Sequence, residues 1–563
     1  MKKNWWKEAV GYQIYPRSFQ DSNGDGIGDL QGIIQRLDYV KDLGIDIIWI
    51  CPMYQSPNDD NGYDISDYQA IMGDFGTMED FDHLLSEVHK REMKLILDFV
   101  PNHTSDEHKW FVESRSSKDN PKRDWYIWRD GKKNKKGKTM AEPNNWESIF
   151  GGSAWEYDKK TDQYYLHVFS TKQPDVNWEN PEARQAIYDM VNWWLGKGID
   201  GFRIDAVSHI KKRAGFPDMP NPKKKKYVSS FDMHMNQEGI HELLEEFKNS
   251  TYAKYDVMTV GEANGVTVNE ADLWVGEEHG KMDMIFQFEH LGLWDAETNL
   301  NLDIVELKNV LSTWQKGLEN KGWNALFIEN HDKPRVVSTW GNDDQYWYES
   351  ATSMAAMYFL MQGTPFIYQG QEIGMTNVQF DSIDDYDDVS AKNLYRIRTE
   401  EGVPHNDIMR MLWASSRDNS RTPMQWSSDK NAGFSNAAPW MKVNPNYKTI
   451  NVKAQEQDEQ SILSFYKKMI RLKKNENIFT YGIYDLLLPD HHQIYAYTRT
   501  LDEEQVVIIT NLSIKDALID EDGITFSSED LILHNLPVDD HGPTDTIVLR
   551  PYEARVYKLK SKK

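Results

Sequence analysis

Asp205 and Glu262 are two carboxyl groups whose setting in the sequence suits acid–base chemistry. Asp205 ends the run Gly-Phe-Arg-Ile-Asp at 201–205, so on a strand Arg203 would share its face and keep the carboxylate ionised. Glu262 follows the apolar residues 257–261, and such a setting can raise the pKa of a carboxyl group enough for it to donate a proton. One ionised and one protonatable carboxyl group on neighbouring strands are what cleavage of a glycosidic bond requires.

Other polar side chains also close apolar runs. Four of these side chains stand at or just after the end of such a run: Asp64, His103, His331 and Asp332. Taken alone, the Arg203–Asp205 pair is equally well a structural ion pair in a core. Because three carboxylates and two histidines recur at strand ends, we expect them to form one site.

The elements that would position these residues alternate between short β-rich runs and helical patterns, which is typical of a parallel sheet. Helices are expected at 30–43, 80–91 and 181–197. Eight strands favour a closed (β/α)8 TIM barrel, in which functional groups project from the carboxyl ends of the strands. The expected strands are 11–19, 45–52, 93–101, 199–207, 255–262, 284–290, 324–332 and 364–372.

Two interruptions and a change of pattern divide the chain. A segment after strand three, 104–174, is rich in Trp, Lys, Gly and Asn and is expected to be an inserted subdomain. The barrel would then comprise 1–103 and 175–479, with a long loop region at about 373–440. From 480 to 563 the strands are short and alternating, which predicts a C-terminal antiparallel β-sandwich domain.

Composition excludes several classes of partner. The net charge of −25 over 563 residues would repel nucleic acid and anionic membranes. Cys51 is the single cysteine and lies in an apolar run, so no internal disulfide forms and a reducing compartment is expected. Neither an export signal nor an apolar segment of membrane-spanning length is evident, which predicts a cytoplasmic protein, either a monomer or a weak homo-oligomer.

The ordered motifs resemble those of the α-amylase family, glycoside hydrolase family 13, and specifically its oligo-1,6-glucosidase and α-glucosidase branch. The resemblance covers nearly the whole chain. Besides the strand-end motifs, it rests on Gly-Tyr-Gln-Ile-Tyr-Pro-Arg-Ser-Phe at 11–19, Gln-Pro-Asp-Val-Asn at 173–177 and Gly-Thr-Pro-Phe-Ile-Tyr-Gln-Gly-Gln-Glu at 363–372.

This resemblance implies a retaining double displacement. Asp205 would attack the anomeric carbon, and Glu262 would protonate the departing oxygen and then activate water. Asp332 would stabilise the transition state. The residues implied in holding the sugar are Arg203, His103, His331, Tyr63 and Phe169.

By the same resemblance, Asp64 and Arg417 would bind hydroxyls at the non-reducing end and close the pocket. Action on a terminal glucose follows from a closed pocket. Arg421 lies four residues after Arg417, and the sequence does not choose between the two arginines.

A loop at 21–29, Asp-Ser-Asn-Gly-Asp-Gly-Ile-Gly-Asp, places oxygen ligands at alternate positions, as the start of an EF-hand does. Gly32 stands where an EF-hand has its bidentate Glu, so the loop is not an EF-hand, and an Asp/Asn/Gly-rich turn is the alternative. The resemblance implies a structural Ca²⁺ and no organic cofactor. The implied ligands are Asp21, Asn23, Asp25, the Ile27 carbonyl and Asp29.

Features of the sequence conflict on whether α-1,4 or α-1,6 bonds are preferred. Ala206 follows the nucleophile where strict α-1,6 enzymes of the branch usually carry Val, which favours maltose and maltooligosaccharides. The motif at 173–177 resembles the α-1,6 side, so an oligo-1,6-glucosidase is the first alternative. A transglycosylase such as a sucrose isomerase, a trehalose-6-phosphate hydrolase and a non-catalytic accessory chain of an amino-acid transporter are the others. The last is disfavoured because all three carboxylates are present.

Overall fold

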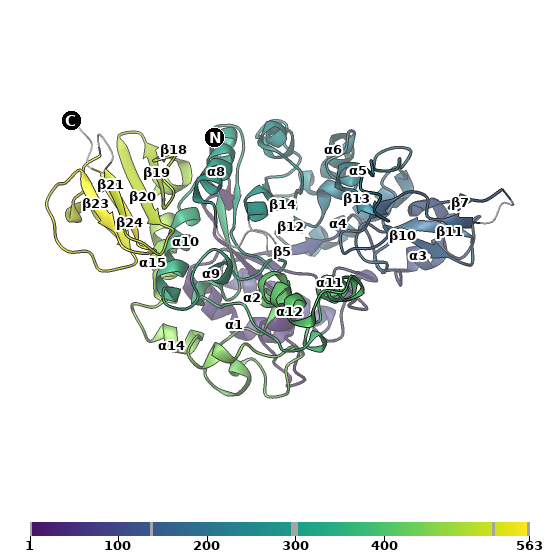
Figure 1. Ribbon diagram of the computed structural model, residues 1–563, viewed down its shortest axis with the longest axis horizontal. Coiled ribbons are helices and arrows are strands. Elements are labelled where there is room, and N and C mark those ends of the chain that lie inside the picture. The colour runs from purple at the N-terminus through teal and green to yellow at the C-terminus, as the bar shows by residue number, and fades with distance from the viewer. Residues whose placement is uncertain (1–2, 136–138, 294–301, 521–523, 560–563) are drawn as a thin grey trace.

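A computed structural model describes residues 3–135, 139–293, 302–520 and 524–559 of the chain. Its centre is a sheet of eight parallel strands in the order β15-β14-β12-β5-β2-β1-β17-β16, with helices around it (Figure 1). All eight strands expected from the sequence are present, each shorter than its apolar run. They are β1 (Gly11–Ile14), β2 (Ile47–Ile50), β5 (Lys94–Phe99), β12 (Gly201–Ile204), β14 (Met258–Glu262), β15 (Met284–Phe286), β16 (Ala325–Leu326) and β17 (Thr364–Tyr368).

The sheet curls into a nearly closed barrel. Its first strand, β1, pairs with both β2 and β17, and the end strands β15 and β16 lie against each other. Phe286 and Phe327 meet across this junction with their ring centroids 4.9 Å apart. Side chains alternate as a pleated strand requires: Phe202 and Ile204 pack against the surrounding helices, while Arg203 points inward over the Trp49 ring.

Helix ends follow local sequence signals. Helix α1 (Leu30–Leu43) begins where the Asp29 side chain accepts a hydrogen bond from the Gly32 amide, and it ends at Gly44 with a φ of 104°. Helix α2 (Met78–Lys90) starts with a capping box between Thr77 and Asp80. These two helices and α4 (Pro181–Gly196) match the predicted helices to within two residues.

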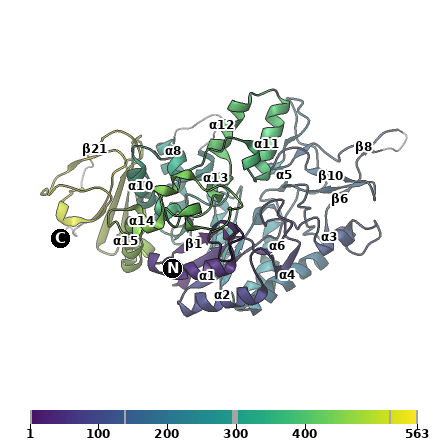
Figure 2. The same cartoon turned by 90° about the horizontal axis from the view of Figure 1, so that it is seen from below.

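The remaining helices complete the layer around the barrel and the region that follows β17. Helices α6 (Ile240–Ser250), α8 (Ile304–Leu318) and α10 (Trp347–Phe359) lie between successive strands. After β17, α11 (Val389–Glu400) and α12 (His405–Ser415) stand side by side above the body of the molecule in the view from below (Figure 2). Short helix α13 (Asp418–Arg421) follows them, and α15 (Ile462–Asn475) packs against α10.

Two smaller sheets lie at opposite ends of the molecule (Figure 1). The segment between β5 and α4 carries the three-stranded sheet β10 (Trp155–Asp158), β11 (Gln163–Leu166) and β6 (Trp128–Arg129). The C-terminal part forms a five-stranded antiparallel sheet and a strand pair. These comprise β18 (Ile483–Leu487), β19 (Ile494–Leu501), β20 (Glu504–Asn511), β24 (Ala554–Leu559) and β22 (Leu531–His534), with β21 (Ala517–Asp520) paired to β23 (Thr546–Leu549).

The C-terminal sheet is attached to the barrel helices by buried polar groups. The Arg499 guanidinium on β19 donates to the Leu360 carbonyl at 2.6 Å and to the Phe479 carbonyl at 2.8 Å. Tyr497 on the same strand donates to the Met357 carbonyl at 3.0 Å. The sheet therefore holds the end of α10 in place behind the barrel.

Candidate active site

Arg203 is the centre of the charged cluster at the carboxyl ends of the strands. It lies opposite Asp98 on β5, and its Nη1 donates to Asp98 Oδ1 at 2.8 Å and to Asp205 Oδ1 at 2.5 Å. Its Nη2 donates to Glu262 Oε2 at the end of β14. The arginine is 2% exposed, so these contacts form in a medium that screens charge poorly. One guanidinium therefore brings Asp205 and Glu262 together, as the sequence predicted.

Glu262 also lies close enough to Asp205 to affect the pKa of its carboxyl group. Burial raises the pKa of Asp205 well above its usual range. The Arg203 charge opposes this shift, but the charge of Glu262 adds to it. The expectation that Arg203 alone keeps Asp205 ionised is therefore corrected.

Asp332 is held in its ionised form. Burial acts to raise the pKa of Asp332, but contact with His331 and the charges of Arg417 and Arg421 keep it well below its usual range. Asp332 Oδ2 lies 3.1 Å from His331 Nε2, and Oδ1 accepts from Arg421 Nη2 at 2.8 Å. A fixed negative charge beside Asp205 can stabilise positive charge that develops on a sugar ring.

The structure separates the two arginines that the sequence left open. Arg417 lines the pocket and stacks over Phe150, with the guanidinium carbon 4.8 Å from the ring centroid. Arg421 is fully buried behind Asp332 and donates from Nε to the His331 carbonyl at 3.0 Å. Arg417 is thus the arginine placed to meet a ligand, and Arg421 orients the residues behind it.

Asp64 does not occupy the position that the sequence suggested. It is 0% exposed, and its carboxylate accepts hydrogen bonds from the Asp59 and Asp60 amides and from the Ser56 hydroxyl. Asp60 lines the pocket instead and forms a 2.9 Å ion pair with Arg417 Nη2. Asp64 shapes the turn, and Asp60 is the carboxylate that the turn presents to a ligand.

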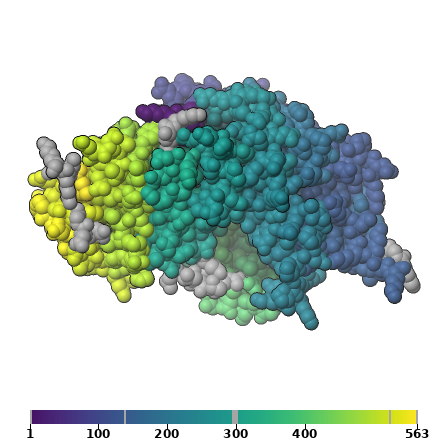
Figure 3. Space-filling view, turned by 90° about the horizontal axis from the view of Figure 1, so that it is seen from above, coloured from purple at the N-terminus to yellow at the C-terminus, as the bar shows by residue number. Residues whose placement is uncertain are grey.

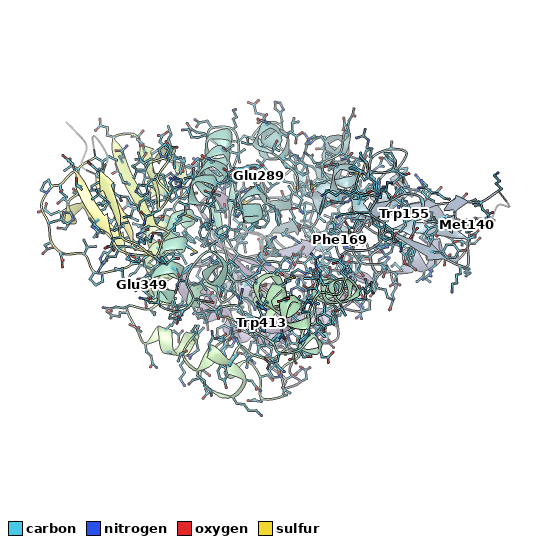
Figure 4. All side chains as sticks on the ribbon, viewed as in Figure 1. Met140, Trp155, Phe169, Glu289, Glu349 and Trp413 are labelled. Carbon is cyan, nitrogen blue, oxygen red and sulfur yellow. The ribbon has the colours of Figure 1, made fainter. Side chains whose placement is uncertain are left out.

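The remaining predicted sugar contacts do converge on the site. Tyr63 donates to Asp98 Oδ2 at 2.9 Å, and its ring stacks on His331 at 5.2 Å between centroids. Phe169 comes from the inserted segment and lies between it and the barrel, with its ring 5.0 Å from that of His103 (Figure 4). Burial, with the Lys212 charge, lowers the pKa of His103 to about 3, so its imidazole is neutral at physiological pH.

These groups line a cavity of about 490 Å³, which is in the range of a small-molecule site. The molecular surface is hollowed beside the green segment that follows β17 (Figure 3). One side of the cavity is polar, and the other is mainly apolar. Its walls include Asp60, Tyr63, His103, Phe150, Phe169, Asp205, Ala206, Met235, Glu262, Asn264, Phe288, Leu291, Asp332, Lys333 and Arg417.

Four residues of the site were not predicted from the sequence: Asp60, Phe150, Lys333 and Asp388. Asp388 precedes α11 and accepts from Arg417 Nε at 2.9 Å. Its only signal was its place in the acidic run at 381–388. Asp60 lies in a turn rich in Asp and Asn, where the type of residue does not reveal which carboxylate faces outward.

The loop at 21–29 is organised by its own acidic side chains. Asp21 accepts from the amides of Asn23, Gly24 and Gly26, and Asp25 accepts from the Ile27 amide. The atoms of this loop that could bind a metal ion are oxygen atoms, the type of ligand that Ca²⁺ prefers. Among the residues that the structure describes, no three His, Cys, Asp or Glu side chains are grouped as a metal site.

Comparison with known proteins agrees with this geometry. The model of the α-amylase catalytic domain matches residues 13–482. The chain belongs to the α-amylase family. It is therefore a glycoside hydrolase, and the fold and the family resemblance expected from the sequence are confirmed.

Relatives within the α-amylase family cover the whole length. A probable oligo-1,6-glucosidase of Bacillus subtilis is 60% identical over 99% of this chain and 100% of the relative. An oligo-1,6-glucosidase of Parageobacillus thermoglucosidasius is 52% identical over 100% of both chains. The crystal structure of an isomaltulose synthase from Erwinia rhapontici superimposes with a TM-score of 0.93 at 42% identity, covering 99% of each chain.

The structure describes residues 3–135, 139–293, 302–520 and 524–559 of this family member. No helix there combines the length and the apolar character needed to cross a bilayer.

Proposed function

We propose that this enzyme is an exo-acting, retaining α-glucosidase that releases terminal glucose from short α-glucosides. The contacts that Asp205 and Glu262 make with the two terminal nitrogens of the Arg203 guanidinium support the stereochemical part. An inverting enzyme needs its carboxyl groups roughly 6.5–9.5 Å apart to admit a water between them, whereas a retaining enzyme keeps them closer. Carboxyl groups that bind the same guanidinium lie close together, which supports attack by the carboxylate itself.

Each step of the double displacement has a group in place. The Asp205 carboxylate forms a bond to the anomeric carbon while the glycosidic bond breaks, and Glu262 transfers its proton to the departing oxygen. Water then attacks the glucosyl ester, Glu262 takes a proton from that water, and Asp205 leaves as a carboxylate. Asp332 remains ionised beside the developing positive charge throughout.

Exo-action is supported by the end of the cavity that Asp60 and Arg417 line. Asp60 and Arg417 close that end of the cavity with their ion pair, so a chain could not continue past the glucosyl unit. Both side chains also present hydrogen-bonding atoms for sugar hydroxyls. A pocket closed in this way takes one terminal residue at a time.

Cleavage of both α-1,4 and α-1,6 bonds is part of the proposal. Ala206 lines the cavity with only a methyl group, which leaves room for the leaving sugar of maltose. The relatives named oligo-1,6-glucosidases support isomaltose as a substrate. A side-by-side rate comparison on maltose, isomaltose, maltotriose and trehalose 6-phosphate tests the proposal. Glucose release from isomaltose with none from maltose would show that the Ala206 argument fails.

A transglycosylase remains the second candidate because an isomaltulose synthase shares the whole fold. Such an enzyme would transfer the glucosyl unit of sucrose to fructose rather than to water. Chromatography of the products from sucrose separates the two functions. Glucose and fructose alone indicate a hydrolase, and isomaltulose or trehalulose indicates a transferase.

We further propose that the loop at 21–29 binds a structural Ca²⁺ through Asp21, Asn23, Asp25, the Ile27 carbonyl and Asp29. Its oxygen donors support this, and the ion would hold the start of α1 rather than take part in the chemistry. Thermal unfolding with Ca²⁺ and with a chelator tests it. We expect a higher midpoint with Ca²⁺, and the difference should vanish in Asp25→Ala. Equal midpoints for the wild type would refute the proposal.

We also propose that the enzyme works in the reducing cytoplasm. Burial raises the pKa of the Cys51 thiol, and no second cysteine exists to pair with it. Cell fractionation with a periplasmic marker tests this proposal. Enzyme found mainly with the periplasmic marker would contradict it.

A further inference from the structure

Lys333 is a cationic side chain in the pocket that no described residue pairs with. It follows Asp332 directly, is half-buried and forms part of the cavity wall. Other lysines removed from solvent have acceptors: Lys212 contacts Asp175 at 2.6 Å, and Lys308 donates to the Leu488 carbonyl at 2.6 Å. No hydrogen bond or ion pair joins the Lys333 ammonium to any residue that the structure describes.

This arrangement costs free energy unless the Lys333 ammonium has a hydrogen-bond acceptor in the cavity. Burial lowers the pKa of Lys333, the charges of Asp332 and Glu262 raise it, and that of Arg417 lowers it again. A shielded ammonium without a hydrogen-bond acceptor loses part of its hydration. Its acceptors must therefore come from what enters the cavity, which is water in the free enzyme and substrate when bound.

Lys333 lines the same cavity as the acid Glu262 and lies close enough for the Glu262 charge to act on its ammonium. Glu262 delivers its proton to the departing oxygen, so the leaving group lies beside it and away from the Asp60–Arg417 wall. Asn264 follows Glu262, while Phe288 and Leu291 follow β15; all three line the cavity together with Lys333. The two apolar side chains offer a surface for a sugar ring, and Lys333 and Asn264 offer polar atoms for its edge.

The charge balance favours a neutral ligand at this position. Four acidic residues line the cavity, Asp60, Asp205, Glu262 and Asp332, against two cationic ones, Arg417 and Lys333. Arg417 is already paired with Asp60, whereas phosphate sites commonly combine several cations or backbone amides. An ammonium near Asp332 and Glu262 is better suited to hydroxyl oxygens, which accept its protons without adding negative charge.

We propose that Lys333 determines leaving-group specificity by donating hydrogen bonds to hydroxyl oxygens of the leaving sugar. The inference rests on the proposed α-glucosidase function. It predicts that the enzyme distinguishes sugar leaving groups from leaving groups of similar size without hydroxyls. A site built to bind a hydroxyl group discriminates strongly against an analogue that lacks it.

The experiment compares Lys333→Met and Lys333→Gln with the wild type on isomaltose, maltose and phenyl α-glucoside, whose leaving group carries no hydroxyl besides the departing oxygen. Lys160→Met, at an exposed position, is the matched control. We expect Lys333→Met to lose about tenfold or more in kcat/KM on both disaccharides, as for one charge-assisted hydrogen bond. It should stay within about twofold on phenyl α-glucoside, and Lys333→Gln should recover part of the loss because its amide still donates.

Three results would overturn the inference. Equal losses on all three substrates would mean that Lys333 acts on Asp332 or on the fold, and no loss on any would mean that it binds nothing. A wild-type preference for trehalose 6-phosphate over trehalose that Lys333→Met abolishes would assign it to an anionic leaving group. If the wild type releases no glucose from phenyl α-glucoside or the disaccharides, the proposed function itself fails.

Discussion

Asp60 and Arg417 form a 2.9 Å ion pair across the wall of the cavity, although 357 positions separate them in the chain. The same guanidinium contacts Asp388 and Asp332, so one cation neutralises carboxylates from three separate loops. The glucosyl end of the cavity therefore depends on a single side chain from the region after β17.

Replacing Arg417 by Met should lower kcat/KM on isomaltose by about 100-fold or more. The change removes a donor from the pocket and leaves Asp60 and Asp388 buried without their cation, which costs several kcal/mol. Steady-state kinetics with circular dichroism as a fold check measures the effect. Arg410→Met is the control, because Arg410 is exposed and contacts Asp407 and the Asn406 carbonyl on its own helix. A loss no greater than that of the control would contradict the assignment.

Asp205→Ala and Glu262→Ala should differ in the product that they form with azide. Both should lose at least about 10⁴-fold in activity on isomaltose. With an activated glucoside, azide can occupy the space left by Asp205 and attack from that face, which gives β-glucosyl azide. In Glu262→Ala azide replaces the attacking water and gives α-glucosyl azide. Product anomers identified by NMR decide between these roles, and Asp256→Asn, at an exposed position, serves as the control. The same anomer from both variants would refute the assignment.

The acid limb of the pH profile should reflect the Asp205–Glu262 pair. The nucleophile acts as a carboxylate and its pKa is raised, so kcat/KM should fall as the pH drops through a value well above 4. Glu262→Gln removes the charge that helps to raise this pKa, so its limb should move to lower pH on α-glucosyl fluoride, which needs little acid assistance. An unmoved limb would show that the Glu262 charge does not raise the pKa of Asp205.

His103→Gln provides a second pH test. The pKa of His103 is lowered to about 3, so the ring stays neutral between pH 5 and 9 and contributes no limb there. The variant should lose activity at every pH while the midpoint of the acid limb stays in place. A shift of that midpoint by about one pH unit would show that His103 titrates with the reaction.

Ala206→Val should reduce activity on maltose more than on isomaltose. Ala206 has a φ of 43°, a left-handed conformation that a β-branched residue adopts only with strain, and its methyl group lines the cavity. We expect the ratio of kcat/KM for isomaltose to that for maltose to rise about fivefold or more, with a lower thermal midpoint. A change of this size in the kcat/KM ratio is of the order that one to two added methyl contacts produce. Ala206→Ser, which adds one atom without branching, is the control; an unchanged ratio for both variants would remove Ala206 as a determinant.

Lys212→Met should destabilise the junction between the barrel and the inserted segment. Lys212 is buried and donates to Asn102 Oδ1 and the His209 carbonyl, both at 2.7 Å, besides its pair with Asp175. Leaving Asp175 buried and unpaired costs about 3–5 kcal/mol. Calorimetry should show a fall of the thermal midpoint by several degrees.

Two companion variants make the Lys212 test decisive. Asp175→Asn, added to Lys212→Met, should restore part of the loss because the buried charge is gone. Lys211→Met removes only an exposed pair with Glu179 and should change little. A double variant as unstable as Lys212→Met would argue against the charge as the cause.

The sequence allowed the barrel strands to be predicted because each is a buried apolar run. Their carboxyl ends then placed Asp205, Glu262 and Asp332 at one rim. The choice between Asp60 and Asp64 was not predictable, because it depends on a turn in which Asn61 and Gly62 adopt φ values of 49° and 99°. That turn directs backbone amides onto Asp64 and leaves Asp60 to face the cavity.

The choice between Arg417 and Arg421 was also beyond the sequence. Arg417 precedes the four-residue helix α13 and Arg421 is its last residue, so each could have faced the site. Packing of Arg421 against Asp332 and the His331 carbonyl decides it. The raised pKa of Asp205 was not predicted, for a different reason. A pKa depends on burial and on every nearby charge, which residue types and spacing do not supply.

Closure of the barrel is delayed while the chain is being synthesised. Strand β1 pairs with β17, and Tyr12 donates to Glu372 Oε1 at 2.8 Å, across 360 positions of the chain. At the usual pace of translation, the ribosome needs roughly 20–70 s between making these two partners. During that interval one edge of β1 lacks its neighbour, so the growing chain carries an unpaired strand edge that a chaperone or another nascent chain could contact. Ribosome-bound chains truncated before β17 should therefore aggregate more readily than those that extend past it.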